Sequence, residues 1–181
     1  MIDLKNPTYI APYQTGFEWK HALLLHLAKK FNLRTFVETG THWGGTLKAM
    51  QPHFKELYSI ELSEHWYQHA IGMFWNVRNV CLIQGDSGVE LEKLLDRVPD
   101  QRPLFWLDAH YSGGDTALAP VDPLVSEVQA IIRLRPNALI VIDDQQPGDH
   151  LAAYGNPEGW TALFHGGVVI MHRGGYEISF D

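Results

Sequence analysis

Five short apolar segments of the sequence each run into an acidic residue, and this regularity constrains the fold more than any other feature. Their length and apolar character predict strands, at Thr35–Glu38, Leu57–Ile60, Val80–Gln84, Leu104–Leu107 and Ala138–Ile142. The acidic residues at or just after their ends are Glu38, Glu61, Asp86, Asp108 and Asp143. In an open parallel sheet the carboxyl ends of the strands share one edge, and ligands bind in the crevice outside it. We therefore expect these carboxylates to meet at one ligand-binding edge.

Helical patterns separate the five strands. The first predicted helix covers residues 17–31, with its apolar residues at Leu24, Leu27, Ala28 and Phe31. Another is predicted to begin near Asp122 and Pro123, with its apolar residues at Leu124, Val128, Ile131 and Ile132. Near the C-terminus, Arg173–Gly175 contains a Gly-Gly turn signal that should join two last strands, Val168–Met171 and Tyr176–Ser179, as a hairpin.

Strands that alternate with helices predict an α/β fold. We expect a Rossmann-like, doubly wound sheet of about seven strands, mostly parallel, in which the C-terminal hairpin supplies one antiparallel strand. Residues 1–15 show no period and predict an irregular N-terminal arm. Residues 16–181 should form one domain of this fold, because 181 residues are a single-domain length.

Composition excludes several classes of partner. The net charge is −7 and the basic residues are scattered, which argues against a nucleic-acid partner, since such binding needs phosphate neutralisation. There is no apolar run of bilayer length and no signal-peptide pattern, so we expect a cytoplasmic protein without a membrane partner. The single cysteine, Cys81, lies among apolar residues and should be buried. A small-molecule acceptor is the partner that remains, and the sequence leaves open whether the chain forms a homo-oligomer.

The turn after the first predicted strand carries the most specific motif. It reads Glu-x-Gly-x-x-x-Gly from Glu38 to Gly44, and should open a helix. A dinucleotide fingerprint, G-x-G-x-x-G, would need a second glycine two residues after Gly40, where His42 stands, so the motif opposes a nicotinamide-dependent oxidoreductase. Glu61 follows Gly40 at nearly the distance, about 20 residues, expected of an acid that binds ribose hydroxyls. The alternative is a helix-opening turn without a ligand.

The motif from Glu38 to Gly44 resembles motif I of the class I methyltransferases that bind S-adenosylmethionine (SAM). The resemblance covers roughly Arg34 to Asp144. It implies that the Gly40 turn lies under the methionine part of SAM, that Glu38 helps hold the cationic end, and that Asp86 reaches the adenine amino group. The cofactor-binding residues that it implies are Glu38, Thr39, Gly40, Thr41, Gly44, Glu61, Leu62, Asp86, Ser87 and Asp108. For Asp86 a turn role is an equal alternative, because Ser87 and Glu90 have the form of a capping box.

Asp108, Asp143 and Asp144 have the character of metal ligands. Strands four and five should be neighbours at about 4.8 Å, which brings the three carboxylates together. Oxygen ligands suit Mg²⁺ or Mn²⁺. Together with the sequence Trp106–Gly114, these three aspartates resemble the pattern of the metal-dependent O-methyltransferases of the catechol and caffeoyl-coenzyme A type. They also resemble that of macrolide sugar O-methyltransferases. The alternative is that these residues cap helices or stabilise turns and bind no metal.

The identity of the general base departs from the catechol-type pattern. Those enzymes carry a Lys shortly after the first metal-binding Asp, and this chain has His110 and Tyr111 there. An imidazole can accept a proton from an acceptor hydroxyl, so His110 together with Asp108 is predicted to be catalytic, with Tyr111 and His150 as alternatives for the base. The sequence thus predicts a SAM-dependent O-methyltransferase for a sugar or phenol, with Mg²⁺ assistance left open. A non-catalytic SAM-binding partner subunit is the alternative, and a nicotinamide-dependent oxidoreductase is the weaker one.

Overall fold

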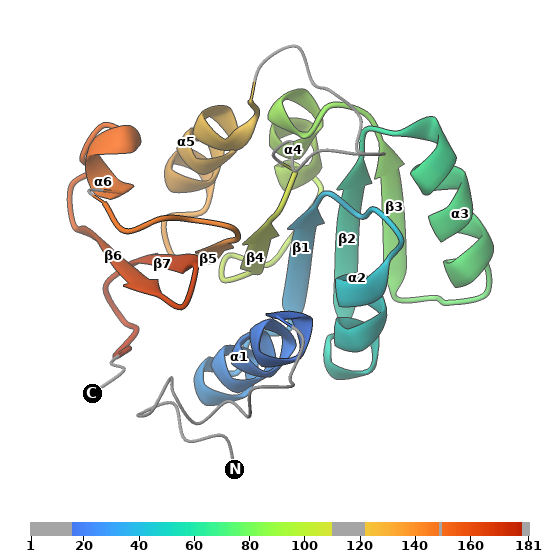
Figure 1. Ribbon diagram of the computed structural model, residues 1–181, viewed down its shortest axis with the longest axis horizontal. Coiled ribbons are helices and arrows are strands. Elements are labelled where there is room, and N and C mark those ends of the chain that lie inside the picture. Colours follow the sequence, from blue (N-terminus) through green and yellow to red (C-terminus); the bar gives the residue numbers. More distant parts are fainter. Residues whose placement is uncertain (1–15, 110–121, 149, 179–181) are drawn as a thin grey trace.

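A seven-stranded sheet with strand order β3-β2-β1-β4-β5-β7-β6 organises the computed structural model, which describes residues 16–109, 122–148 and 150–178 (Figure 1). The strands are β1 Thr35–Thr39, β2 Glu56–Glu61, β3 Val80–Gln84, β4 Leu104–Leu107, β5 Leu139–Ile142, β6 Trp160–His165 and β7 Val168–Arg173. Strands β1 to β5 pair in parallel, while β7 is antiparallel to both β5 and β6. The predicted Rossmann-like sheet with one antiparallel strand is confirmed.

Helices cover both faces of the sheet, as the doubly wound prediction requires (Figure 1). Their bounds are α1 Gly16–Phe31, α2 Gly45–Met50, the 3-10 helix η2 Gln51–His53, α3 Glu64–Phe74, α4 Ser87–Leu95, α5 Leu124–Leu134 and α6 His150–Ala153. Side chains alternate along each strand, so β1 sends Phe36 into a core with α1, α2 and α3, and Val37 into a second core with α4 and α5. Within the described residues, no helix has the length and apolar character needed to cross a membrane.

The C-terminal hairpin differs from the predicted one. Its strands are β6 and β7, and its turn is Gly166-Gly167, where both residues have positive φ. Two positive φ values suit the tight hairpin turn that matches strand twist. Gly174 and Gly175 also have positive φ, so the antiparallel pairing of β6 with β7, which brings His165 opposite Val168, decides that Gly166-Gly167 makes the turn. The segment after β7 forms no strand in its described part, because Tyr176 turns into the core against Phe31, with ring centroids 4.8 Å apart.

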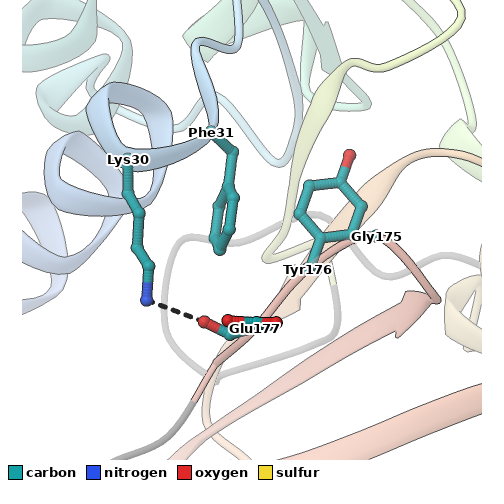
Figure 2. Close-up of a pocket in the computed structure, with 5 residues that line it drawn as sticks. All are labelled: Lys30, Phe31, Gly175, Tyr176 and Glu177. Carbon is teal, nitrogen blue, oxygen red and sulfur yellow. Dashed lines mark hydrogen bonds between the residues drawn. The ribbon is translucent and has the colours of Figure 1, made fainter.

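The segment after β7 is held at the amino edge of the sheet. Lys30 Nζ donates to the Glu177 carbonyl at 2.7 Å, and the Tyr176 hydroxyl donates to the Asn137 carbonyl, just before β5, at 2.6 Å. A shallow pocket lies between these groups, lined also by Phe31 and Gly175 (Figure 2). It is on the opposite edge from the predicted carboxylates, so we do not regard it as the functional site.

The third strand is an edge strand, which corrects one expectation about burial. β3 pairs only with β2 in the sheet, and Cys81 on it is exposed rather than buried. Apolar neighbours in the sequence therefore did not predict burial, because no strand of the described part of the chain pairs with the free edge of β3.

One buried cation joins the C-terminal ends of α4 and α5. The Arg135 guanidinium donates to the carbonyls of Val98 at 2.7 Å and Asp100 at 3.2 Å, and also bonds the Leu95 carbonyl. One side chain thus donates hydrogen bonds to backbone carbonyls at and after the end of α4, which lack partners within the helix.

We predict that Arg135→Ala destabilises the protein by about 3 kcal/mol, because it removes charge-assisted hydrogen bonds and leaves buried carbonyls unsatisfied. Arg133→Ala is the matched control, since Arg133 forms an exposed ion pair with Glu92 at 2.8 Å and should cost less than about 1 kcal/mol. Denaturant unfolding of both variants measures the difference, and equal losses would contradict the assignment.

Candidate functional site

The order of the strands places the topological switch point of the sheet between β1 and β4. The chain builds β2 and β3 on one side of β1, then returns to build β4 and β5 on the other. Such a reversal is where open α/β sheets bind ligands. Backbone hydrogen bonds continue one residue past the strands, from the amides of Gly40 to Ile60, Asp108 to Thr39 and Asp143 to Leu107. These bonds set Gly40, Asp108 and Asp143 in one row along the predicted edge.

The Gly40 turn presses directly against β4. Gly40 has φ +82°, and a Cβ atom there would overlap the backbone carbonyl of Asp108. Gly44, also at φ +82°, precedes the first residue of α2 and donates its amide to the Thr41 carbonyl at 2.8 Å. Both glycines of the motif are thus explained by backbone conformation, and Gly40 additionally by a close approach that only glycine allows.

A chain of hydroxyl groups ends on the buried carboxylate of Glu38. The Ser59 hydroxyl donates to Glu38 Oε2 at 2.6 Å, and Thr41 Oγ1 lies 2.6 Å from Ser59 Oγ. Because the single Ser59 proton goes to Glu38, Thr41 donates to Ser59. Burial raises the pKa of Glu38 well above its ordinary value, the Ser59 hydrogen bond lowers it, and the charges of Asp108 and Glu61 raise it further. A nearby cation would relieve this unfavourable charge.

Glu61 fastens the motif turn to the end of β2. Its Oε2 accepts the backbone amide of His42 at 2.7 Å and its Oε1 accepts that of Ser63 at 2.8 Å. Only 6% of Glu61 is exposed, and Leu62, the next residue, is half-buried. The carboxylate thus has a structural role at the position predicted to bind ribose, and its remaining lone pairs are the ones that a ribose could use.

Asp86, rather than Ser87, is the N-cap of α4. Asp86 has extended backbone angles and its Oδ1 accepts the amide of Gly88 at 2.9 Å, while Ser87 is already the first helical residue. The predicted capping box of Ser87 and Glu90 is therefore wrong, because Asp86 caps the helix and the residue three positions after it is Val89, which cannot close such a box. Asp86 has the turn role, and its contact with adenine stays a prediction.

Glu127 on α5 is a buried acid at this edge that the sequence analysis did not single out. It is 1% exposed, and its Oε1 finds no hydrogen-bond partner among the described residues. Burial raises the pKa of Glu127 to about 7, against the lowering effect of the Ser87 hydroxyl. Thr39 and Ser87 were predicted to bind the cofactor, so this acid belongs to the same part of the molecule.

The structure brings together the three carboxylates predicted to bind a metal. One oxygen each of Asp108, Asp143 and Asp144 lies within 4.8 Å of the others. Burial, followed by the charges of Asp143 and Asp144, raises the pKa of Asp108 to about 8. The Asp144 amide donates to Asp143 Oδ1 at 2.7 Å, in a backbone turn with φ +49° at Asp144. Spacing along parallel strands therefore predicted this cluster correctly.

Lys20 from α1 lies within this cluster, and the sequence analysis missed it. Its Nζ lies 2.5 Å from Asp143 Oδ1 and 3.1 Å from Asp144 Oδ1. Burial lowers the pKa of Lys20, but the hydrogen bonds and charges of Asp143 and Asp144 outweigh this effect and raise it. The oxygen set suits Mg²⁺ or Mn²⁺, but an ammonium group occupies the place that the ion would take. The residues present therefore fit a divalent ion only if Lys20 moves.

Two signals in the sequence could have identified Lys20 and Glu127. Lys20 precedes Leu24 by four residues, so it continues the apolar side of the first helix. Glu127 follows Leu124 by three residues and occupies an equivalent position in α5. A charged residue on the inward side of an amphipathic helix needs a buried partner, which marks both as candidate site residues.

The predicted base is outside the described part of the chain. His110 and Tyr111 fall in residues 110–121, and the predicted N-terminal arm, residues 1–15, is outside as well. His150, the third alternative, is half-buried in α6 and stacks on Phe164 with ring centroids 6.0 Å apart. Its Nε2 is buried without a hydrogen-bond partner among the described residues. The choice among the three remains a prediction.

Comparison with known proteins gives matches in structure only. The sequence matches no protein-family description. It matches no curated protein. Similar solved structures include the O-methyltransferase TomG from Streptomyces achromogenes, solved with SAM (TM-score 0.64, 18% identity, 91% of this chain and 83% of TomG covered). An rRNA methylase from Streptococcus thermophilus is similar with a TM-score of 0.59 and 15% identity, over 90% of this chain and 99% of the methylase. The N-methyltransferase NodS from Bradyrhizobium japonicum WM9, solved with S-adenosylhomocysteine, is similar with a TM-score of 0.57 and 13% identity, over 96% of this chain and 95% of NodS.

These likenesses establish the fold. The chain has the Rossmann-like α/β fold of class I methyltransferases, over nine tenths or more of its length in these three cases. The three proteins carry names for three different acceptor classes, so this fold is compatible with methyl transfer to several kinds of acceptor.

We predict that Gly40→Ala destabilises the protein by about 3 kcal/mol, because alanine adds both strain at positive φ and a clash with the Asp108 carbonyl. Gly167→Ala is the matched control. Gly167 has φ +89° but open space around its Cβ position, so only the backbone strain, about 1 kcal/mol, applies there. Denaturant unfolding compares the two, and similar losses would show that β4 does not constrain the turn.

We predict that Glu127 makes stability depend on pH. Its pKa is about 7 in the folded protein against an ordinary 4.5, so the folded state binds the proton more tightly. Stability from this group is complete below pH 4.5 and falls as the pH rises to 7. The unfolding free energy of Glu127→Gln relative to wild type should therefore increase by about 3 kcal/mol between about pH 4 and pH 8. Glu158→Gln, at an exposed carboxylate, should show no such trend.

Proposed function

We propose that the chain is a cytoplasmic SAM-dependent methyltransferase that methylates an oxygen of a small hydroxylated acceptor, such as a sugar or a phenol. One arrangement carries the proposal: the Gly40 turn, the buried acid Glu38 and the half-buried acid Asp108 flank the switch point of a methyltransferase fold. SAM carries a positive sulfonium, which would favour the ionised form of both acids. Its ribose would lie near Glu61 and its adenine near Asp86 and Ser87.

The transfer itself needs positioning and charge stabilisation. The acceptor oxygen attacks the methyl carbon of SAM in line, the carbon–sulfur bond breaks, and its electron pair stays on the sulfur of S-adenosylhomocysteine. The hydroxyl proton passes to a base, for which His110 is the proposal, with Tyr111 and His150 as alternatives. Asp108, next to the turn, would orient the acceptor hydroxyl.

The catechol-type resemblance would add Mg²⁺ or Mn²⁺ at Asp108, Asp143 and Asp144. The donor oxygens suit such an ion, but the Lys20 ammonium lies 2.5 Å from Asp143 and 3.1 Å from Asp144. We therefore do not route the proposed transfer through a metal. Divalent assistance remains the second form of the proposal, in which Lys20 would have to withdraw.

The binding test compares three ligands by calorimetry: SAM, S-adenosylhomocysteine and NAD. We expect SAM to bind and NAD not to bind, because the turn lacks the second glycine of a dinucleotide site. Glu38→Gln should weaken SAM about tenfold more than S-adenosylhomocysteine, because both ligands carry the same α-ammonium and α-carboxylate but only SAM has the additional positive charge of the sulfonium. Glu64→Gln, at an exposed position on α3, is the matched control and should change neither affinity.

The activity test uses SAM with a labelled methyl group and a panel of phenols and sugars. Label in an ether product would support the proposed reaction. Firm SAM binding without transfer to any acceptor would support a non-catalytic SAM-binding partner subunit instead. Binding of NAD in preference to SAM would contradict the proposal and favour an oxidoreductase.

A further inference from the structure

Lys20 is built into the acidic cluster rather than lying over it. Its side chain is 15% exposed and that of Asp143 is 3% exposed, with 2.5 Å between Nζ and Oδ1. The same Nζ donates to Asp144 Oδ1 at 3.1 Å, so one ammonium bridges two carboxylates that follow β5. A pair as buried as this is screened little by water, unlike an exposed ion pair.

The position of Lys20 follows from the sequence of α1. Counting from the apolar residues Leu24, Leu27 and Phe31, Lys20 is one helical turn earlier on the same side. Its methylene groups therefore run along the core side of α1, and the charged end reaches the carboxyl edge of the sheet. Lys30, ten residues later on the same helix, bonds the Glu177 carbonyl at the amino edge instead (Figure 2).

An ammonium group and a divalent ion compete for the same oxygens. Mg²⁺ binds carboxylate oxygens at about 2.0 to 2.1 Å, and Mn²⁺ uses similar oxygen ligands. Bound to Asp143 and Asp144, such an ion would lie within a few ångströms of Nζ, where the repulsion between the two positive charges is severe. Only one of the two cations can use the cluster at a time.

We propose that Lys20 is the resident cation of this site, so that an ammonium group from α1 replaces the divalent ion that the catechol-type resemblance implies. In this arrangement Lys20 is a positioning residue: it holds Asp143 and Asp144 in place beside Asp108, and α1 is fastened to the edge where the acceptor would bind. The role in acceptor binding rests on the proposed function, whereas the exclusion of the metal does not.

The test measures binding of Mn²⁺ alone to the purified full chain, by electron paramagnetic resonance of the free ion. Wild type, Lys20→Arg and the matched control Lys30→Met should bind weakly or not at all. Lys20→Met should bind one Mn²⁺ at least about tenfold more tightly than wild type, because the carboxylates keep their charge and lose the competing cation. Adding Asp144→Asn to Lys20→Met should remove the gained site.

Four results would overturn the proposal. They are equal Mn²⁺ affinity of wild type and Lys20→Met, absence of Mn²⁺ binding by a folded Lys20→Met variant, a gained site that survives Asp144→Asn, and tight one-to-one binding by wild type that Asp144→Asn abolishes. The last result needs no change at Lys20, so it remains decisive if Lys20→Met does not fold. Thermal unfolding of each variant establishes that it is folded.

Chelation separates this proposal from the proposed function. If the chain transfers methyl groups, extensive EDTA treatment should leave the rate of the wild type unchanged, and a loss of activity that Mg²⁺ restores would overturn the role of Lys20. If the chain transfers no methyl groups, the Mn²⁺ contrast between wild type and Lys20→Met still stands, so the failure of one proposal does not imply failure of the other.

Discussion

The crowding of acids at one edge of a parallel sheet is the constraint on which the rest of this structure depends. Parallel strands bring their carboxyl ends together, so acidic residues that end successive strands cannot avoid one another. Each buried carboxylate must then be hydrogen-bonded, paired or kept neutral. The chain uses a different device at each strand: the Ser59 hydroxyl for Glu38, two backbone amides for Glu61, and Lys20 for Asp143.

The carboxylates along this edge differ in how strongly they are paired within the chain, and this difference indicates where a cationic ligand would bind. Glu61 accepts two backbone amides and Asp143 pairs with the Lys20 ammonium, whereas the buried Glu38 accepts a neutral hydroxyl and the half-buried Asp108 lies beside two further carboxylates. Burial and neighbouring carboxylates raise the pKa of both Glu38 and Asp108. A cationic ligand placed between β1 and β4 would therefore interact most with Glu38 and Asp108. This is the region where the Gly40 turn comes closest to β4. The proposed SAM site and the proposed role of Lys20 thus concern adjacent parts of one edge, which meet at Asp108.

Lys20 and Glu127 lie on the inward sides of α1 and α5, whose apolar positions the sequence predicted. The apolar positions of both helices were predicted, and each helix packs as expected on its own face of the sheet. A period of apolar residues does not identify the charged residue that shares the inward side of each helix. An inward charge is costly unless it has a buried partner, so the positions of these two residues along their helices already indicate a polar site beneath them.

The sequence by itself determined the alternation of the five parallel strands with helices, and the edge at which Glu38, Glu61, Asp108 and Asp143 meet. These features depend on local periodicity and on the geometry that every parallel sheet shares. Tertiary structure alone decided that Gly166-Gly167 makes the hairpin, that Cys81 is exposed on an edge strand, and that Lys20 reaches Asp143 across 123 positions of the chain. The physical reason is that these outcomes depend on which distant parts of the chain come into contact. A local sequence pattern does not contain that information.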